Sequence, residues 1–138
     1  MRAVAIDLDG ALGDTRPLWD DWLAEAARRF GVEAGRLDQE LVNWRQLLER
    51  FAEERVPVYL RPDAEATAAL RRLHSGGTRI GVFTDAPDEL ARVALAHLGA
   101  ARRVDAVEAG ADALQRLLER LGADALVVRT REQLVNLR

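Results

Sequence analysis

The sequence predicts an α/β fold in which helices cover both faces of a doubly wound parallel sheet, with a small helical-hairpin cap inserted after the first strand. Short apolar runs rich in β-branched residues alternate with segments whose apolar residues recur every three or four positions. Strands that alternate with helices in this way pair in parallel through right-handed crossovers. The length of 138 residues suits one such domain.

The first predicted strand leads directly into a pair of aspartates. The apolar run over residues 3–6 is followed by Asp7 and Asp9, and Gly10 then breaks the pattern. Because side chains along a strand alternate, both carboxylates are expected to point the same way at the carboxyl end of the strand. Open α/β sheets bind their ligands at that end.

Two helices are predicted to follow as a hairpin. The first is capped by Asp14 or Thr15 and ends at Gly31, and the second runs from about Arg36 to Arg55. The predicted division is therefore residues 16–56 for the small helical cap, and residues 1–15 and 57–138 for the α/β core.

All three tryptophans of the chain lie in the hairpin, at positions 19, 22 and 44. Two helices alone bury little surface, so their apolar faces must pack on each other, on the sheet domain or on a second subunit. A private hairpin core is the favoured interpretation. A homodimer through the tryptophan-bearing hairpin is the alternative.

The rest of the chain continues the alternation, with prolines marking the return from the hairpin and aspartates at predicted helix starts. The remaining predicted elements are a loop over residues 57–62, a helix capped by Asp63 over 63–73, a strand over 79–84, a helix capped by Asp85 over 85–98, a strand over 104–107, a helix over 111–121, a strand over 125–128, and a short helix or extended tail from residue 130.

The composition excludes several function classes. A net charge of −3, with acidic and basic residues interleaved, predicts neither a nucleic-acid partner nor a membrane partner. The absence of cysteine excludes disulfides, thiolate zinc sites and a cysteine nucleophile. All 20 basic residues are arginine, so no lysine is present to serve a catalytic role. A cytoplasmic location is expected.

The two aspartates suggest phosphoryl-transfer chemistry. Neighbouring carboxylates repel each other unless one is protonated or a cation lies between them, and Mg²⁺ would accept oxygen ligands from both. Asp7 or Asp9 could then attack a phosphorus centre while the other protonates the leaving group. The alternative is that both are turn or cap residues, because aspartate before glycine is common in turns.

The stretch AIDLDGALGD resembles the first motif, DxDGTLxD, of the haloacid dehalogenase (HAD) superfamily, in particular its phosphoglycolate-phosphatase-like branch. Ala11 replaces the usual threonine. The resemblance implies a Rossmann-like core with Asp7 as nucleophile and Asp9 as general acid/base. It also implies Mg²⁺ held by Asp7 and the backbone carbonyl of Asp9, and a small phosphorylated molecule as ligand.

A second motif of the family is similar to the end of the strand over residues 79–84. There the hydroxyl of Thr84 and the backbone amides of Asp85 and Ala86 would bind the phosphate. A carboxylate at Asp85 is unusual, since it would repel a phosphate. The alternative is that the Thr84 hydroxyl caps the following helix.

The third and fourth motifs depart from the family. The usual lysine is missing from the turn at residues 109–112, and Arg102 or Arg103 is the nearby candidate to supply its charge. The usual acidic residue after the last strand is replaced by Thr130, which has an arginine on either side. Those positive charges disfavour Mg²⁺. Glu132 would be a substitute ligand, although a surface residue is the favoured interpretation.

The favoured functional prediction is a HAD-like protein with impaired or no catalysis that serves as a binding or interaction module. The alternative is an active Mg²⁺-dependent phosphatase of a small phosphomonoester, acting through an aspartyl-phosphate on Asp7. His74 and His97, near the C-terminal ends of predicted helices, are interpreted as surface residues.

Overall fold

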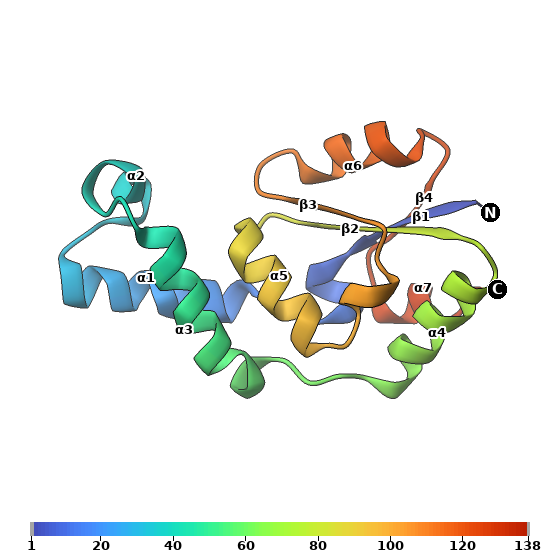
Figure 1. Ribbon diagram of the computed structural model, residues 1–138, viewed down its shortest axis with the longest axis horizontal. Helices are drawn as coiled ribbons and strands as arrows, with labels where there is room; N and C mark the ends of the chain where they lie inside the picture. The colour runs from blue at the N-terminus through green and yellow to red at the C-terminus, as the bar shows by residue number, and fades with distance from the viewer. Residues whose placement is uncertain (1, 138) are drawn as a thin grey trace.

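The computed structural model describes residues 2–137 and has a four-stranded parallel sheet at its centre, with the strand order β3-β2-β1-β4 (Figure 1). The strands are β1 (Ala3–Asp7), β2 (Arg79–Thr84), β3 (Ala106–Ala109) and β4 (Leu126–Val128). The helices are α1 (Arg16–Phe30), α2 (Leu37–Glu40), α3 (Trp44–Tyr59), α4 (Ala64–Ser75), α5 (Asp88–His97), α6 (Ala113–Leu121) and α7 (Arg131–Val135), with shorter turns η1 (Leu8–Leu12), η2 (Ala34–Arg36) and η3 (Ala101–Arg103). The predicted doubly wound α/β class is confirmed.

The sheet lies between two layers of helices. Helix α6 covers one face, whereas α4, α5 and α7 lie on the other (Figure 1). Alternation along β1 supplies both cores, since Val4 and Ile6 belong to the larger core and Ala3 and Ala5 to the core under α6. Both faces of β1 are therefore buried, as expected of a central parallel strand.

The hairpin is joined to the sheet domain by a continuous core. Helix α3 packs against both α1 and α5. Trp19, Trp22 and Trp44 form a cluster with ring centroids 5.6–6.1 Å apart, and Trp22 and Trp44 are only 3% and 7% exposed. The Trp44 indole N–H also donates a hydrogen bond to Asp38 at 2.8 Å. The tryptophans thus pack against one another within the hairpin.

The second predicted helix of the hairpin differs from the observed one. It is broken between α2 and α3, and α3 continues through Pro57 to Tyr59, so the loop predicted from residue 57 begins only after Tyr59. Pro57 is exposed in the last turn of α3. The proline removes one backbone hydrogen bond of the helix, but α3 continues for two more residues and the Leu60 amide still donates to the Val56 carbonyl oxygen.

Two further boundaries were predicted wrongly. Asp85 does not cap a helix, because α5 begins at Asp88 and Pro87 occupies the cap position. The third strand lies at 106–109 instead of 104–107, since Asp105 is used outside the strand, where its carboxylate accepts a hydrogen bond from the Ile80 amide at 2.8 Å.

Between residues 2 and 137, none of the helices has the length and apolar character needed to cross a membrane.

The close approach of α6 to the sheet depends on Gly81 in β2. A Cβ atom at Gly81 would lie 2.6 Å from Leu117 Cδ1 and 2.7 Å from Leu121 Cδ1. We expect Gly81→Ala to lower the free energy of unfolding by about 1–3 kcal/mol through overpacking, as measured by urea denaturation. Gly35→Ala is the control, because a Cβ at Gly35 meets no atom within 4 Å. Equal stabilities of the two variants would contradict this packing.

Candidate active site

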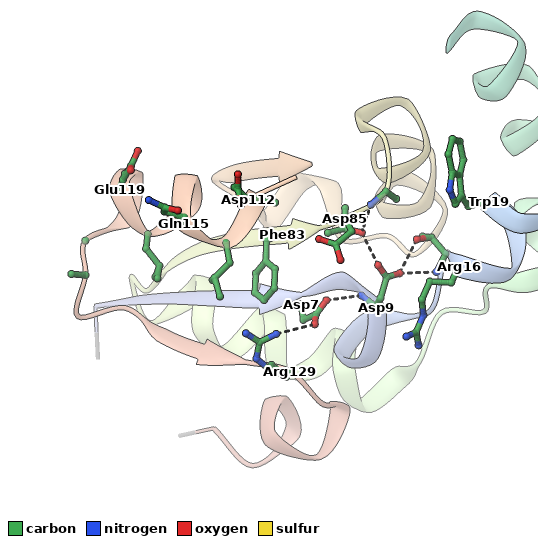
Figure 2. A pocket seen from close by; sticks show the side chains of 18 residues that line it. Asp7, Asp9, Arg16, Trp19, Phe83, Asp85, Asp112, Gln115, Glu119 and Arg129 are labelled. Atoms are coloured by element: carbon green, nitrogen blue, oxygen red, sulfur yellow. Dashed lines mark hydrogen bonds and ion pairs between the residues drawn. The ribbon is translucent and has the colours of Figure 1, made fainter. Parts of the chain in front are cut away.

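A cleft of about 1060 Å³ lies at the carboxyl end of β1 and β2, between the start of α1 and helix α6 (Figure 2). Asp7 and Asp9 line it together with Thr84, Asp85 and Ala86, so the structure brings all the predicted site residues to one place. The apolar part of its wall is formed by side chains of β2, α1 and α6, namely Phe83, Trp19, Ala113, Leu114 and Leu118.

Asp7 ends β1 in the middle of the sheet and is partly buried. Its Oδ1 accepts a hydrogen bond from the Asp9 amide at 3.1 Å. Burial of the carboxyl is the largest effect on its pKa and raises the pKa of Asp7 above the ordinary value of 3.8. The neighbouring charges of Asp9 and Asp85 act in the same direction, whereas the amide hydrogen bond and the charge of Arg129 act against them. The negative charge of Asp7 is therefore only partly compensated.

Asp9 is engaged by three hydrogen bonds from two distant segments. Its Oδ1 accepts from both the amide and the hydroxyl of Thr15, each at 2.7 Å, and its Oδ2 accepts from the hydroxyl of Thr84 at 2.6 Å. Thr15 and Thr84 are each 1% exposed. The Asp9 carboxylate thus ties the start of α1 to the end of β2. To protonate a leaving group it would have to carry a proton beside these donors, on the one lone-pair site of Oδ2 that they leave open.

The segment predicted to bind phosphate also forms hydrogen bonds within the protein. The Thr84 hydroxyl donates to Asp9 and accepts a hydrogen bond from the Ala86 amide at 3.1 Å. Asp85 is exposed and lines the cleft. Thr84 therefore stabilises the turn after β2, as its alternative interpretation as a capping hydroxyl suggested, although the helix itself begins later.

The cation nearest to Asp7 is one that the sequence did not single out for this role. Arg129 Nη1 lies 3.6 Å from Asp7 Oδ2, and its guanidinium carbon is 5.5 Å from the centroid of the Phe83 ring (Figure 2). Arg102 and Arg103 lie in η3, before β3 begins, and so belong to the opposite end of the strands from the cleft. The signal that could have identified Arg129 is its position directly after the last strand, beside the end of β1.

The segment after β4 is held by hydrogen bonds between its own residues. Thr130 caps α7, with its hydroxyl accepting from the Gln133 amide at 3.1 Å, and Gln133 Oε1 accepts from the Arg129 amide at 2.8 Å. Glu132 is exposed on α7 and does not line the cleft. The interpretation of Glu132 as a surface residue agrees with this position.

The site was also tested for its fit to a divalent cation. Within residues 2–137, no group of three or more histidine, aspartate or glutamate side chains is arranged to hold a metal ion. Both carboxylate oxygens of Asp9 are already hydrogen-bonded, which leaves Asp7 with a guanidinium beside it. Mg²⁺ is usually held by one or two carboxylates, with waters and phosphate oxygens completing its octahedron. Here the positive charge of Arg129 lies beside Asp7, the one carboxylate left for an ion, so the residues present do not fit it.

The two histidines differ in their surroundings. His74 is exposed on α4. His97 is partly buried, and its Nε2 lies 2.9 Å from the carbonyl oxygen of Leu60 just after α3. The interpretation of His97 as a plain surface residue is therefore wrong, because this contact joins the end of the hairpin to α5.

Comparison with known proteins identifies the fold. No family model matches the chain, and no curated protein matches it. Among solved structures, CbbY from Rhodobacter sphaeroides in complex with phosphate has a TM-score of 0.68 at 16% identity, over 92% of this chain and 76% of that chain. A protein assigned as a β-phosphoglucomutase from Thermotoga maritima has a TM-score of 0.61 at 19% identity, over 92% and 75%. A protein assigned as a phosphoglycolate phosphatase from Lactobacillus plantarum has a TM-score of 0.55 at 14% identity, over 97% and 81%. The chain therefore has a HAD-like fold, as its first motif predicted.

The contacts of Asp9 predict a structural role that can be measured. Asp9→Ala removes the acceptor from two buried hydroxyls and one amide, so we expect a loss of about 1–3 kcal/mol or more in the free energy of unfolding, measured by urea denaturation. Asp20→Ala, on the exposed surface of α1, is the control and should change stability by less than about 0.5 kcal/mol. An Asp9→Ala protein as stable as this control would show that the three hydrogen bonds contribute nothing.

The raised pKa of Asp7 predicts that this residue lowers the free energy of unfolding to an extent that depends on pH. The folded state holds the Asp7 proton more tightly than the unfolded state, so stability falls as the pH rises from 3.8 through the raised pKa. Asp7→Asn should therefore be more stable than the wild type at pH 7, and this difference should shrink as the pH is lowered toward 3.8. Denaturation curves at several pH values measure it.

Asp14 is a control because its pKa is shifted in the opposite direction from that of Asp7. The Arg16 side chain lowers the pKa of Asp14, so its contribution is present above 3.8 and is lost as the pH falls through the lowered pKa. Asp14→Asn should be less stable than the wild type at pH 7. A pH-independent difference for Asp7→Asn would contradict the burial argument.

Proposed function

We propose that this chain is a HAD-like protein that keeps the phosphohydrolase scaffold, has impaired or no phosphatase activity, and acts as a binding or interaction module. The observation that carries the proposal is the engagement of Asp9. The carboxylate expected to act as general acid/base instead accepts three hydrogen bonds from Thr15 and Thr84 and holds two segments together.

The charges around the cleft support the same proposal. Phosphoryl transfer depends on positive groups that stabilise the charge of the transferring phosphoryl group. The lining includes five acidic side chains and two arginines, one of which, Arg16, pairs with Asp14 at 2.8 Å. The cleft therefore carries an excess of negative charge, which opposes both the approach of a phosphate and the stabilisation of a phosphoryl transition state.

A small phosphorylated molecule remains the ligand that the HAD-like resemblance implies. Its phosphate would meet Thr84 and the backbone around Asp85 and Ala86. The carboxylates of Asp7 and Asp85 would weaken its binding, since Mg²⁺, which supplies the compensating charge in the expected chemistry, does not fit the residues present. Weak phosphate binding without turnover is the behaviour that these charges favour.

The alternative is an active Mg²⁺-dependent phosphatase in which Asp7 is the nucleophile. Its support is the position of Asp7 at the centre of the carboxyl edge, open to a cleft large enough for a phosphomonoester. In that function the proton would have to be carried on the one lone-pair site of Asp9 Oδ2 that Thr84 leaves open.

Hydrolysis of p-nitrophenyl phosphate distinguishes the two functions. We expect the wild-type chain and Asp7→Asn to release p-nitrophenol at the same background rate, with and without Mg²⁺, while an active phosphatase measured in parallel verifies the assay. Turnover that requires both Mg²⁺ and Asp7 would overturn the proposed function and establish the phosphatase.

The homodimer through the hairpin stays a prediction. Trp22 and Trp44 are nearly fully buried within one chain, so a subunit contact on the hairpin would rest on exposed apolar side chains such as Phe30 (44% exposed) and Val42 (89% exposed).

A further inference from the structure

The position of Arg129 is determined by strand pairing. Ile6 in β1 pairs with Val128 in β4, so the next residues, Asp7 and Arg129, leave the sheet side by side at its carboxyl edge. The Arg129 backbone is held from two directions. Its amide donates to Gln133, and its carbonyl oxygen lies so close to Gly10 that a Cβ there would be 2.4 Å away. The strand register and these backbone contacts therefore determine where Arg129 leaves the sheet, and its exposed side chain lies beside Asp7.

The Arg129 side chain turns toward the carboxylate. Its Nη1 lies 3.6 Å from Asp7 Oδ2 and its guanidinium carbon is 5.5 Å from the centroid of the Phe83 ring, in a side chain that is 57% exposed (Figure 2). This charge lowers the pKa of Asp7, against the larger effect of burial. Arg129 therefore already supplies positive charge at the carboxylate oxygen that faces it.

A divalent cation at the same carboxylate would meet three obstacles. The other oxygen, Asp7 Oδ1, already accepts the Asp9 amide. The Asp9 carboxylate has its own three donors. Arg129 presents N–H donors and a positive charge where the ion would need an oxygen ligand.

We propose that the guanidinium of Arg129 takes the place of a divalent cation beside Asp7, so that this HAD-like site binds no metal ion. The inference rests on the proposed function and supplies its physical cause, because a fixed monovalent charge cannot coordinate Asp7 and a ligand oxygen together as an ion does. Of the three obstacles, Arg129 is the one that a substitution removes while Asp7 and the Asp9 backbone carbonyl stay in place. Replacing Arg129 by an acidic residue should create a Mg²⁺ site with Asp7.

Metal binding by the intact chain tests this directly. Mn²⁺ binding followed by electron paramagnetic resonance, and the shift of the unfolding temperature with Mg²⁺, should detect no specific site in the wild type. Arg129→Asp should bind either ion at least about tenfold more tightly, since a repulsive charge is exchanged for an oxygen ligand. Arg129→Gln removes the charge without adding a carboxylate and should lie between the two.

Three controls make the result specific. Arg131→Asp adds the same charge two residues away, where the side chain faces Asp63 at 3.7 Å, and should not create a site. Asp7→Asn in the Arg129→Asp background should remove the gained affinity, and Arg129→Lys should remain without a metal site. Circular dichroism verifies that each variant is folded, and Arg129→Gln carries the test if Arg129→Asp does not fold.

The outcomes separate this inference from the proposed function. Wild-type Mn²⁺ binding that depends on Asp7, without turnover of p-nitrophenyl phosphate, would overturn the role of Arg129 and leave the impaired catalysis standing. Turnover by the wild type without metal would overturn the proposed function and leave the role of Arg129 intact. Folded variants that lack the charge of Arg129 and gain no metal affinity would also overturn the inference.

Discussion

The parallel pairing of β1 with its two neighbours is the constraint on which the rest of the site depends. Pairing with β2 aligns Asp7 with Phe83, and pairing with β4 aligns Ile6 with Val128. Each pairing is held by backbone hydrogen bonds and by a core on both faces of the strand. A slip of one residue would exchange Val4 and Ile6 of one core with the alanines of the other and disrupt the packing of both. Thr84 and Arg129 consequently meet Asp7 at one edge, although they are far apart in the sequence.

The same edge shows how a catalytic motif can serve a structural purpose. Asp9 sits between two buried threonines, and its hydrogen bonds connect the first turn of the hairpin to the end of β2. A carboxylate in this position stabilises the fold, because its loss leaves buried hydroxyls without a partner. The presence of the first motif therefore identifies the fold better than it identifies an activity.

Local patterns in the sequence were sufficient for most of the fold. The apolar runs identified β1 and β2, and the glycine at position 31 identified the end of α1, where it adopts the left-handed conformation with φ 67°. The errors have local causes. A proline favours the end of a helix, yet Pro57 lies within the last turn of α3. An aspartate before a helix favours a cap, yet Pro87 occupies the cap position of α5.

The sequence was sufficient to predict which residues form the site, but not how they contact one another. The motif placed Asp7, Asp9 and Thr84 at one edge, which follows from parallel topology alone. The hydrogen bond between Asp9 and Thr84 joins residues 75 positions apart, and the proximity of Arg129 to Asp7 depends on the register of β4. Neither contact is encoded in a local pattern. Proximity in the sequence favours Arg102 and Arg103 as the source of positive charge, but their place before β3 puts them at the opposite end of the strands from the cleft.

The central proposal is that the guanidinium of Arg129, and not a metal ion, supplies the positive charge beside Asp7. A high-resolution crystal structure of the chain grown in Mg²⁺ tests it most directly. The account predicts the Arg129 guanidinium next to Asp7, with no ion between the Asp7 carboxylate and the Asp9 carbonyl. An octahedral ion bound to Asp7, with Arg129 turned out of the cleft, would contradict it.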